Sequence, residues 1–380
     1  MEDAISRWWT SFTSQVPRIN ALFAGEEDWD LPGWMDTHLQ QGVNAELMWE
    51  FGPACEGDGH RLVITPEVRR DLRPLVREII RRAPAIPGWE FYEYRLPETF
   101  EQAADTVEAR VGGDLSSLQV TATAGDFNCI DLRVLGFPPG TDPEQASNMA
   151  FVASEALLGE EIFDHWIGLF DTVDSVPEGQ TAFPIAELRD RVTALIKTIQ
   201  TEKMPDRPWY QIDTAEGAPW SVLELDSEPV DDCYGQEDIL IAVTLCPELV
   251  ENTHSNFSFF SGRFSRCGET FCYLKIDGSD GLDDSKFGDR TEIEDALNSV
   301  LRPAKLGTNI GGGTGHRYSY IELALTDVDA AWQKIQQVLR EGQVPVRTWL
   351  QFHDDELAGQ WRGLYDQTPA PLLPDFGKTD

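Results

Sequence analysis

The strongest constraint on the fold is the order of apolar segments between residues 271 and 352. Four segments have the alternation and the β-branched or aromatic content of strands, at 271–277, 306–310, 318–325 and 344–352, and two have helical periodicity, at 292–301 and 327–339. Thr326 or Asp327 supplies the N-cap of the second helix. The order βαββαβ predicts a ferredoxin-like layer with both helices on one face of an antiparallel sheet.

The first half of the chain contains two successive units, each predicted to be a hairpin followed by a helix and a strand. The strands are expected at 46–51, 61–65, 89–93, 118–124, 129–135 and 162–171, and the helices at 70–83 and 142–158. A helix that Pro17 interrupts precedes them at 4–23, and a further helix follows at 185–201. The whole chain is therefore predicted to be α+β, with antiparallel sheets that carry helices on one face.

A chain of 380 residues is long enough for two domains. The polar stretch KMPDRPW contains two prolines, and residues 204–208 within it are the preferred boundary. We therefore predict an N-terminal α+β domain at 1–205 and a C-terminal ferredoxin-like domain at 206–366. Residues 367–380, with prolines at 369, 371 and 374, are predicted to form a loose tail.

Acidic residues dominate the charge, because 66 Asp and Glu face 30 Lys and Arg and give a net charge of -36. The 41% of hydrophobic residues still predict a folded protein rather than a disordered acidic chain. Such a charge repels nucleic acid at long range, so no nucleic-acid partner is expected. No apolar stretch is long enough for a membrane helix, and the N-terminus lacks the pattern of a signal peptide, which predicts a cytoplasmic protein with no membrane partner.

Three interpretations of the acidity remain open. The acids form a solvated surface, or a face that captures a basic protein, or a mimic of nucleic acid. The basic residues are 23 Arg and seven Lys, a bias that composition or salt adaptation produces without any binding function. The sequence leaves the oligomeric state open.

A glycine-rich stretch at 307–315 resembles a phosphate-binding loop in composition. No Lys follows it, and the next element has strand character, so we expect a flexible hairpin connection. The functional alternative is a backbone nest for a small anion, formed by Gly312 and Gly313 with His316 and Arg317 beside them.

A short segment has the opposite charge to the rest of the chain. Residues 61–82 contain seven Arg and three acids, and Arg73, Arg77 and Arg81 recur every four residues, with Arg70 one turn earlier. These arginines either pair with carboxylates of the same protein or bind an anion or an acidic partner.

Signatures of catalysis and metal binding are missing from the sequence. There is no GxSxG or HExxH motif, and the six cysteines are scattered, so neither a cofactor nor a metal is predicted. Cys233 and His353, each beside two aspartates, could meet in the fold, although a structural role is expected for each. The acidic run 277–289 lacks the spacing of a calcium loop and is expected to be a solvated loop.

Two stretches carry a family resemblance, RLVITPEVRRDLRPLVREIIRRAPAIPGWEFYEYRLP at 61–97 and ALLGEEIFDHWIG at 156–168. They resemble uncharacterised bacterial proteins of the DUF695 and ribonuclease E regulator B-like group. The resemblance implies a small α+β sandwich and, for the regulator-like group, a role in binding another protein. It implies no site residues.

Together these features favour a non-enzymatic cytoplasmic protein of the inhibitor, regulator or immunity type, which binds a basic protein through an acidic face. The alternative is an enzyme or a small-ligand-binding protein with a site between the two domains. That alternative predicts that a His converges with carboxylate or Cys side chains where the domains meet.

Overall fold

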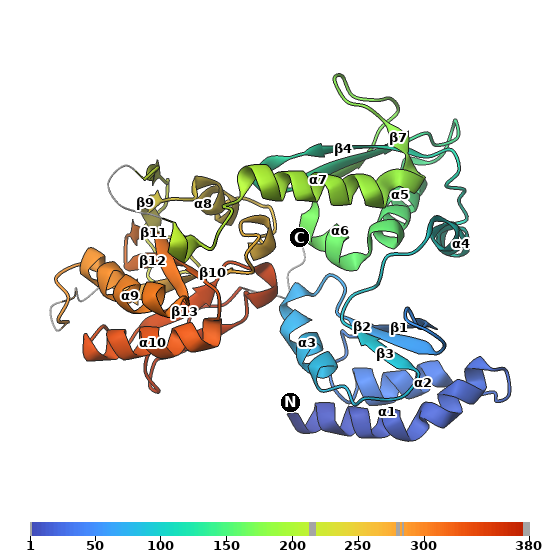
Figure 1. The fold of residues 1–380 in the computed structure, drawn as a ribbon, viewed down its shortest axis with the longest axis horizontal. Helices are drawn as coiled ribbons and strands as arrows, with labels where there is room; N and C mark the ends of the chain where they lie inside the picture. The colour runs from blue at the N-terminus through green and yellow to red at the C-terminus, as the bar shows by residue number, and fades with distance from the viewer. Residues whose placement is uncertain (1, 213–217, 279–281, 283–284, 375–380) are drawn as a thin grey trace. The chain divides into compact units, whose positions relative to one another are not determined.

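The computed structural model describes residues 2–212, 218–278, 282 and 285–374 (Figure 1). The chain divides into two compact units, Met1–Glu98 with Leu158–Glu161, and Thr99–Leu157 with Ile162–Asp380. Both contain helices and sheets, so the predicted α+β class is confirmed. The boundary predicted at 205/206 lies inside the second unit, and residues 375–380 of the predicted tail lie outside the described residues.

The first unit packs helices against a three-stranded sheet. Its elements are α1 (Glu2–Phe23), α2 (Leu31–Met35), η1 (Asp36–Gln40), β1 (Met48–Pro53), β2 (His60–Thr65), η2 (Arg70–Leu72), α3 (Arg73–Arg81) and β3 (Trp89–Tyr92). Strands β1 and β2 form the predicted antiparallel hairpin, and β3 pairs with β2 in parallel. Pro74 lies in the first turn of α3, where its missing N–H costs nothing.

Helix α1 does not break at Pro17, contrary to the prediction. A proline inside a helix removes one backbone hydrogen bond and strains the preceding turn. The apolar face on both sides of it, from Ile5, Trp8 and Phe12 to Ile19, is buried in the core of the unit. This burial holds the helix continuous through the proline.

The second unit begins with a four-stranded sheet of order β6-β5-β4-β7. Its elements are α4 (Phe100–Val111), β4 (Gln119–Ala124), η3 (Asp126–Asn128), β5 (Ile130–Leu135), α5 (Pro143–Leu158), α6 (Glu160–Trp166), β6 (Ile167–Thr172), β7 (Phe183–Pro184), η4 (Ile185–Glu187) and α7 (Leu188–Lys203). The strand predicted at 162–171 is wrong in its first half, because residues 162–166 belong to α6. There Phe163 packs edge-on against Phe151 of α5, and this tertiary contact outweighs local strand propensity.

The remaining elements form a seven-stranded sheet of order β14-β13-β10-β12-β11-β9-β8. They are η5 (Trp209–Gln211), β8 (Ser221–Glu224), β9 (Ile239–Thr244), α8 (Pro247–Thr253), η6 (Ser261–Arg263), β10 (Thr270–Asp277), α9 (Arg290–Ala304), β11 (Gly307–Gly315), β12 (Tyr318–Leu325), α10 (Val328–Glu341), β13 (Thr348–Phe352), η7 (Asp355–Leu357) and β14 (Trp361–Gly363). The four central strands, β13-β10-β12-β11, are antiparallel and follow the predicted ferredoxin-like βαββαβ order. Asp289 and Asp327 cap the two helices of this layer.

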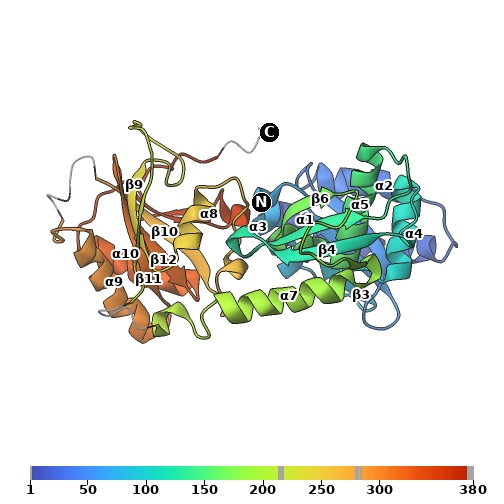
Figure 2. The same ribbon diagram turned by 90° about the horizontal axis from the view of Figure 1, so that it is seen from above.

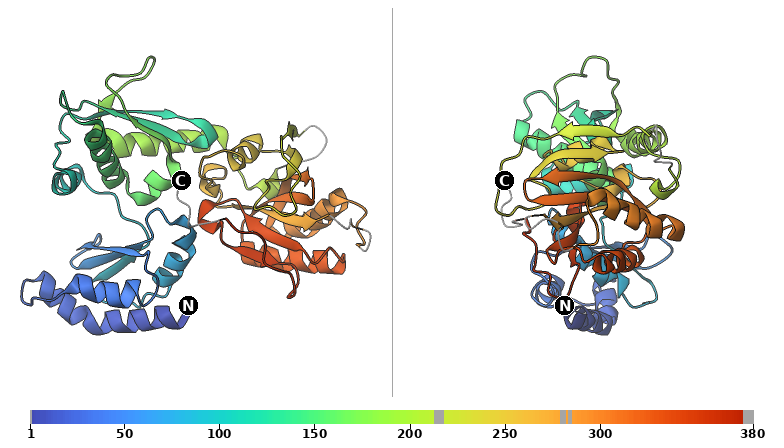
Figure 3. Two further views of the ribbon diagram at one scale, coloured as in Figure 1. Left: turned by 180° about the vertical axis from the view of Figure 1, so that it is seen from behind. Right: turned by 90° about the vertical axis from the view of Figure 1, so that its left-hand side faces the viewer.

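Helices α9 and α10 lie side by side on one face of this sheet, and α8 lies on the other (Figures 2 and 3). Strand β10 is buried on both faces. Cys272, Leu274 and Ile276 pack against α9 and α10, whereas Tyr273 and Lys275 point to the opposite face. Residues 271–277 therefore contribute to two cores at once.

The glycine-rich stretch is a strand rather than the predicted flexible connection. It forms β11, which pairs with β12 and β9, and the turn contains only His316 and Arg317. A Cβ on Gly313 would lie 2.1 Å from Ile239 Cδ1, and one on Gly311 would lie 2.6 Å from Val243 O. The glycines therefore permit close approach of β9 instead of supplying a flexible turn.

Candidate functional site

Six arginines of residues 61–82 form ion pairs with carboxylates of the first unit. The ion pairs are Arg61–Glu50, Arg69–Asp71, Arg73–Glu160, Arg77–Glu93, Arg81–Glu78 and Arg82 with Glu2 and Glu78. Arg70 also has a partner. The hydrogen bond from Arg81 and the neighbouring Arg82 lower the pKa of Glu78 to about 2. Beside these six arginines, carboxylates of the chain itself thus occupy positions that an anionic ligand would take.

Arg73 is the most deeply buried of these arginines. Its guanidinium donates to Glu160 Oε1 at 2.6 Å and to Glu93 O at 2.7 Å, and it lies over the ring of Tyr94. The other oxygen of Glu160 accepts from the backbone N–H of Arg95 at 2.9 Å. Glu160 thereby ties residues 158–161 to the first unit, which makes Arg73 a structural residue in this geometry.

The four residues of the proposed anion nest do not form one loop. Gly312 and Gly313 are buried in the middle of β11, whereas His316 and Arg317 form the turn that follows it. His316 Nε2 lies 3.0 Å from Ser227 O, and Arg317 forms an ion pair with Asp277 at 2.8 Å.

The face of the sheet opposite α9 and α10 contains a buried polar network that the sequence did not reveal. Lys275, 1% exposed, donates to Cys233 O at 2.6 Å, contacts Cys233 Sγ at 3.3 Å and lies over the Tyr318 ring. Tyr320 donates to Asp238, and burial together with this carboxylate raises the pKa of Tyr320 far above its usual value. Tyr320 therefore remains a neutral donor.

A second part of the network joins Glu322 to His353. Glu322, 3% exposed, lies 2.6 Å from His353 Nε2 and accepts from Gln236, while His353 Nδ1 lies 3.2 Å from Thr253 Oγ1. His353 thus pairs with Glu322, and Cys233 pairs with Lys275. The buried groups named here therefore have partners, as a stable network requires.

The cysteines are all unbridged, and burial makes Cys129, Cys246 and Cys272 poor nucleophiles. It raises the pKa of Cys246 to about 12 and raises the pKa of Cys129 and Cys272 as well. A raised pKa removes the thiolate that nucleophilic catalysis requires.

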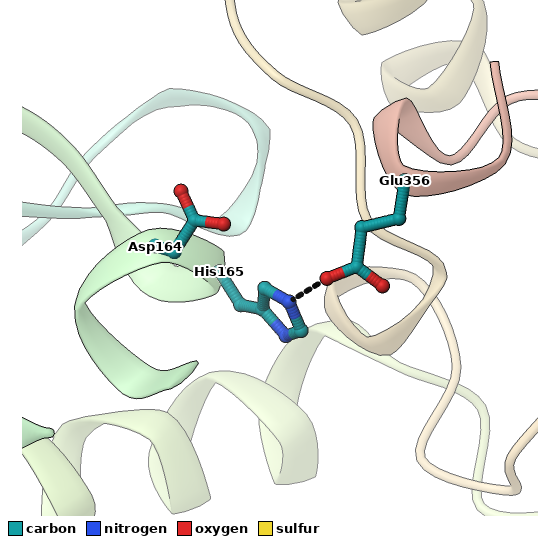
Figure 4. Close-up of side chains that lie close together, drawn as sticks. All are labelled: Asp164, His165 and Glu356. Atoms are coloured by element: carbon teal, nitrogen blue, oxygen red, sulfur yellow. Dashed lines mark hydrogen bonds and ion pairs between the residues drawn. The ribbon is translucent and has the colours of Figure 1, made fainter. Parts of the chain in front are cut away.

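One cluster of a histidine and two carboxylates combines distant parts of the sequence in the second unit. Asp164 and His165 lie at the end of α6, and Glu356 lies in η7 (Figure 4). His165 Nε2 is 2.8 Å from Glu356 Oε1, and one ligand atom from each of the three residues lies within 4.8 Å of the others. The three residues come from both sides of the boundary predicted at 205/206, and all three lie within the second unit. The enzyme or ligand-binding alternative stays a prediction.

The outer edge of the seven-stranded sheet exposes apolar side chains. Val222 on the edge strand β8 is 65% exposed, Ile241 on β9 is 46% exposed, and Trp220 precedes β8 and is also exposed. Val222 and Ile241 lie on the same face as Gly312, over which Arg290 and Glu294 of α9 pack. The helical layer does not cover Val222 and Ile241, which is why they are exposed. We call Trp220, Val222 and Ile241 the β8–β9 strip.

The residues that flank this strip in the sequence are strongly acidic. Residues 208–262 contain 11 Asp and Glu and neither Lys nor Arg. Several of the acids next to β8 and β9 are exposed, namely Glu224, Asp226, Glu228, Asp231 and Glu237. This run without a basic residue is visible in the sequence, and it is the signal that could have located the strip.

In comparisons with protein-family models, curated proteins and solved structures, no match to this chain is found. The family resemblance of residues 61–97 and 156–168 therefore stays a prediction. Among the described residues, none of the helices combines the length and the apolar character needed to cross a membrane.

Proposed function

We propose that this chain is a cytoplasmic protein-binding protein of the regulator, inhibitor or immunity type, whose partner is a basic protein. The observation that carries this proposal is the β8–β9 strip, an apolar surface inside a 55-residue stretch, 208–262, that has acids and no Lys or Arg. Contiguous exposed apolar side chains with a polar rim are typical of interaction sites.

The position of β8 supports this function. β8 pairs with β9 on one side and is the last strand of the sheet. An edge strand presents backbone N–H and C=O groups to which an extended segment of a partner can add. Val222 and Ile241 would then contact the apolar side chains of that segment.

The charge supports a basic partner. Exposed carboxylates beside the strip, such as Glu224 and Asp226, attract Lys and Arg at long range and fix the choice of partner. Because the attraction is between exposed charges, salt weakens it.

Binding of model peptides to the full chain tests the proposal. The probe is a fluorescent ten-residue peptide that alternates Lys and Val, compared with a peptide that alternates Glu and Val, at about 50 mM and about 500 mM salt. We expect anisotropy to show binding of the basic peptide, weaker binding at high salt, and no binding of the acidic peptide.

Substitutions separate the strip from general attraction to the acidic surface. The double variant Val222→Ser/Ile241→Ser should bind the basic peptide about tenfold or more weakly than the wild type, because apolar contact is lost while the charge is unchanged. The matched control is Val346→Ser, an exposed valine of the second unit outside the strip, which should bind normally. Equal binding by the double variant and the wild type would contradict the proposed site.

A further inference from the structure

We propose that Asp164, His165 and Glu356 form a binding site for one divalent transition-metal ion of the manganese or zinc type. The three residues lie in the second unit, on α6 and η7, and Figure 4 shows the His165 ring directed at the Glu356 carboxylate. This inference is independent of the basic-partner proposal, since none of the three residues belongs to the β8–β9 strip.

The spacing of the donor atoms suits a metal ion. Ligand atoms that bind one ion at about 2.0–2.2 Å lie roughly 3–4 Å from each other. One ligand atom from each of the three residues lies within 4.8 Å of the others, and the His165–Glu356 pair is at 2.8 Å. Small side-chain rotations are therefore enough to place all three around an ion.

The surroundings hold the ligands in place. Glu356 is 4% exposed, and the Phe260 ring packs on the His165 imidazole with 4.2 Å between the ring centroids. This packing restricts the rotation of the ring, so little conformational entropy is lost when an ion binds.

Electrostatics favours a cation at this position. Two carboxylates that share a partly buried site repel one another, and the repulsion is stronger than it would be in water. A divalent ion between them turns this repulsion into attraction. The competing arrangement is the direct His165–Glu356 contact without an ion, and the experiment must separate the two.

The donor set defines the kind of ion. One imidazole nitrogen and two carboxylate oxygens suit Mn²⁺, Fe²⁺ or Zn²⁺, whereas Ca²⁺ takes six to eight oxygen ligands in most proteins. Three protein ligands leave coordination positions for water or a small ligand, as in catalytic rather than structural zinc sites.

Titration of the chelator-treated full chain with Mn²⁺ tests the site. Mn²⁺ is the decisive probe because the six thiols of the chain bind it poorly, whereas they bind Zn²⁺ well. We expect calorimetry to show one ion per chain. Glu356→Gln and Asp164→Asn, which preserve shape while removing charge, should weaken binding by about tenfold or more.

The controls are His316→Gln and Glu341→Gln, which change a histidine and an exposed acid elsewhere in the second unit. Both should bind Mn²⁺ as the wild type does, and all variants should keep the wild-type circular dichroism spectrum. If the wild type takes up no Mn²⁺, the three side chains only contact one another and the proposal fails. Equal binding by wild type, Glu356→Gln and Asp164→Asn also overturns it, because the ion would then lie on general surface carboxylates.

Discussion

The two faces of the seven-stranded sheet are built in different ways from the same strands. Toward α9 and α10 the sheet presents Leu274, Ile276 and Leu323, a continuous apolar surface. Toward α8 it presents Lys275 and Glu322, which are also buried and form hydrogen bonds with Cys233 and His353, respectively. Around β10 and β12 the first face is stabilised mainly by burial, whereas the second also depends on a network of buried hydrogen bonds.

The difference shows where this fold tolerates change. Apolar cores accept many substitutions of similar volume, whereas a polar network fails when one member leaves its partners buried and unsatisfied. On the polar face, specific partners as well as burial therefore fix the position of α8, whose Thr253 Oγ1 lies 3.2 Å from His353 Nδ1.

The largest expected effect comes from Glu322→Ala. This change leaves His353 and Gln236 buried without their shared partner, so the free energy of unfolding should fall by about 3–5 kcal/mol. Urea denaturation at neutral pH measures the loss. Glu322→Gln, which keeps a hydrogen-bonding oxygen, should lose clearly less, and a loss below about 1 kcal/mol for Glu322→Ala would show that the network is dispensable.

A smaller effect is expected on the apolar face. Leu274→Ala removes buried methyl groups between β10 and the two helices and should cost about 3 kcal/mol through lost transfer energy and a cavity. Because no charge is involved, urea denaturation should give the same loss at about pH 6 and about pH 8. A pH-dependent loss would mean that the two faces are coupled through the strand.

The smallest effect concerns Glu269, which directly precedes β10. Burial raises its pKa, against the opposing hydrogen bonds from Ser265 Oγ and the Trp209 N–H. Its contribution to stability is fully present below the unfolded-state pKa of about 4.3 and is lost as pH rises through the raised folded-state pKa.

The variant Glu269→Gln keeps the shape without the charge. Its unfolding free energy minus that of the wild type should therefore increase as pH rises from about 4 to about 7. Urea titrations at several pH values measure this difference. A difference that stays constant or falls would contradict a buried, destabilising carboxylate.

The sequence predicted the central layer well because local signals agreed there. Asp327 before an amphipathic helix and alternation along 318–325 both pointed to the observed elements. Local signals gave the wrong secondary structure where contacts with distant residues determine it. In α6 the contact is between Phe163 and Phe151, and in β11 it is the close approach of β9 to the glycines.

The candidate metal site could not be predicted for a related reason. His165 and Glu356 are separated by 191 positions, and each is unremarkable in its own segment. The β8–β9 strip could have been predicted in part, because the run 208–262 without Lys or Arg is visible in the sequence. The exposure of Val222 could not, because it depends on which strands the helices cover.

The glycines of β11 also bear on how the sheet assembles. Three consecutive glycines, 311–313, provide no side chains that would fix the register of β11 against its neighbours. A shift in register by one residue would turn the other side chains of the strand to the wrong face. Asn309 fixes the register, because its backbone N–H and its side chain both form hydrogen bonds with Asn298 of α9. A bulge between Asn309 and Gly311 follows directly. The Asn298–Asn309 pair therefore fixes the register of β11. Because β9 pairs with β11 and β8 pairs with β9, the register of both strands depends on it.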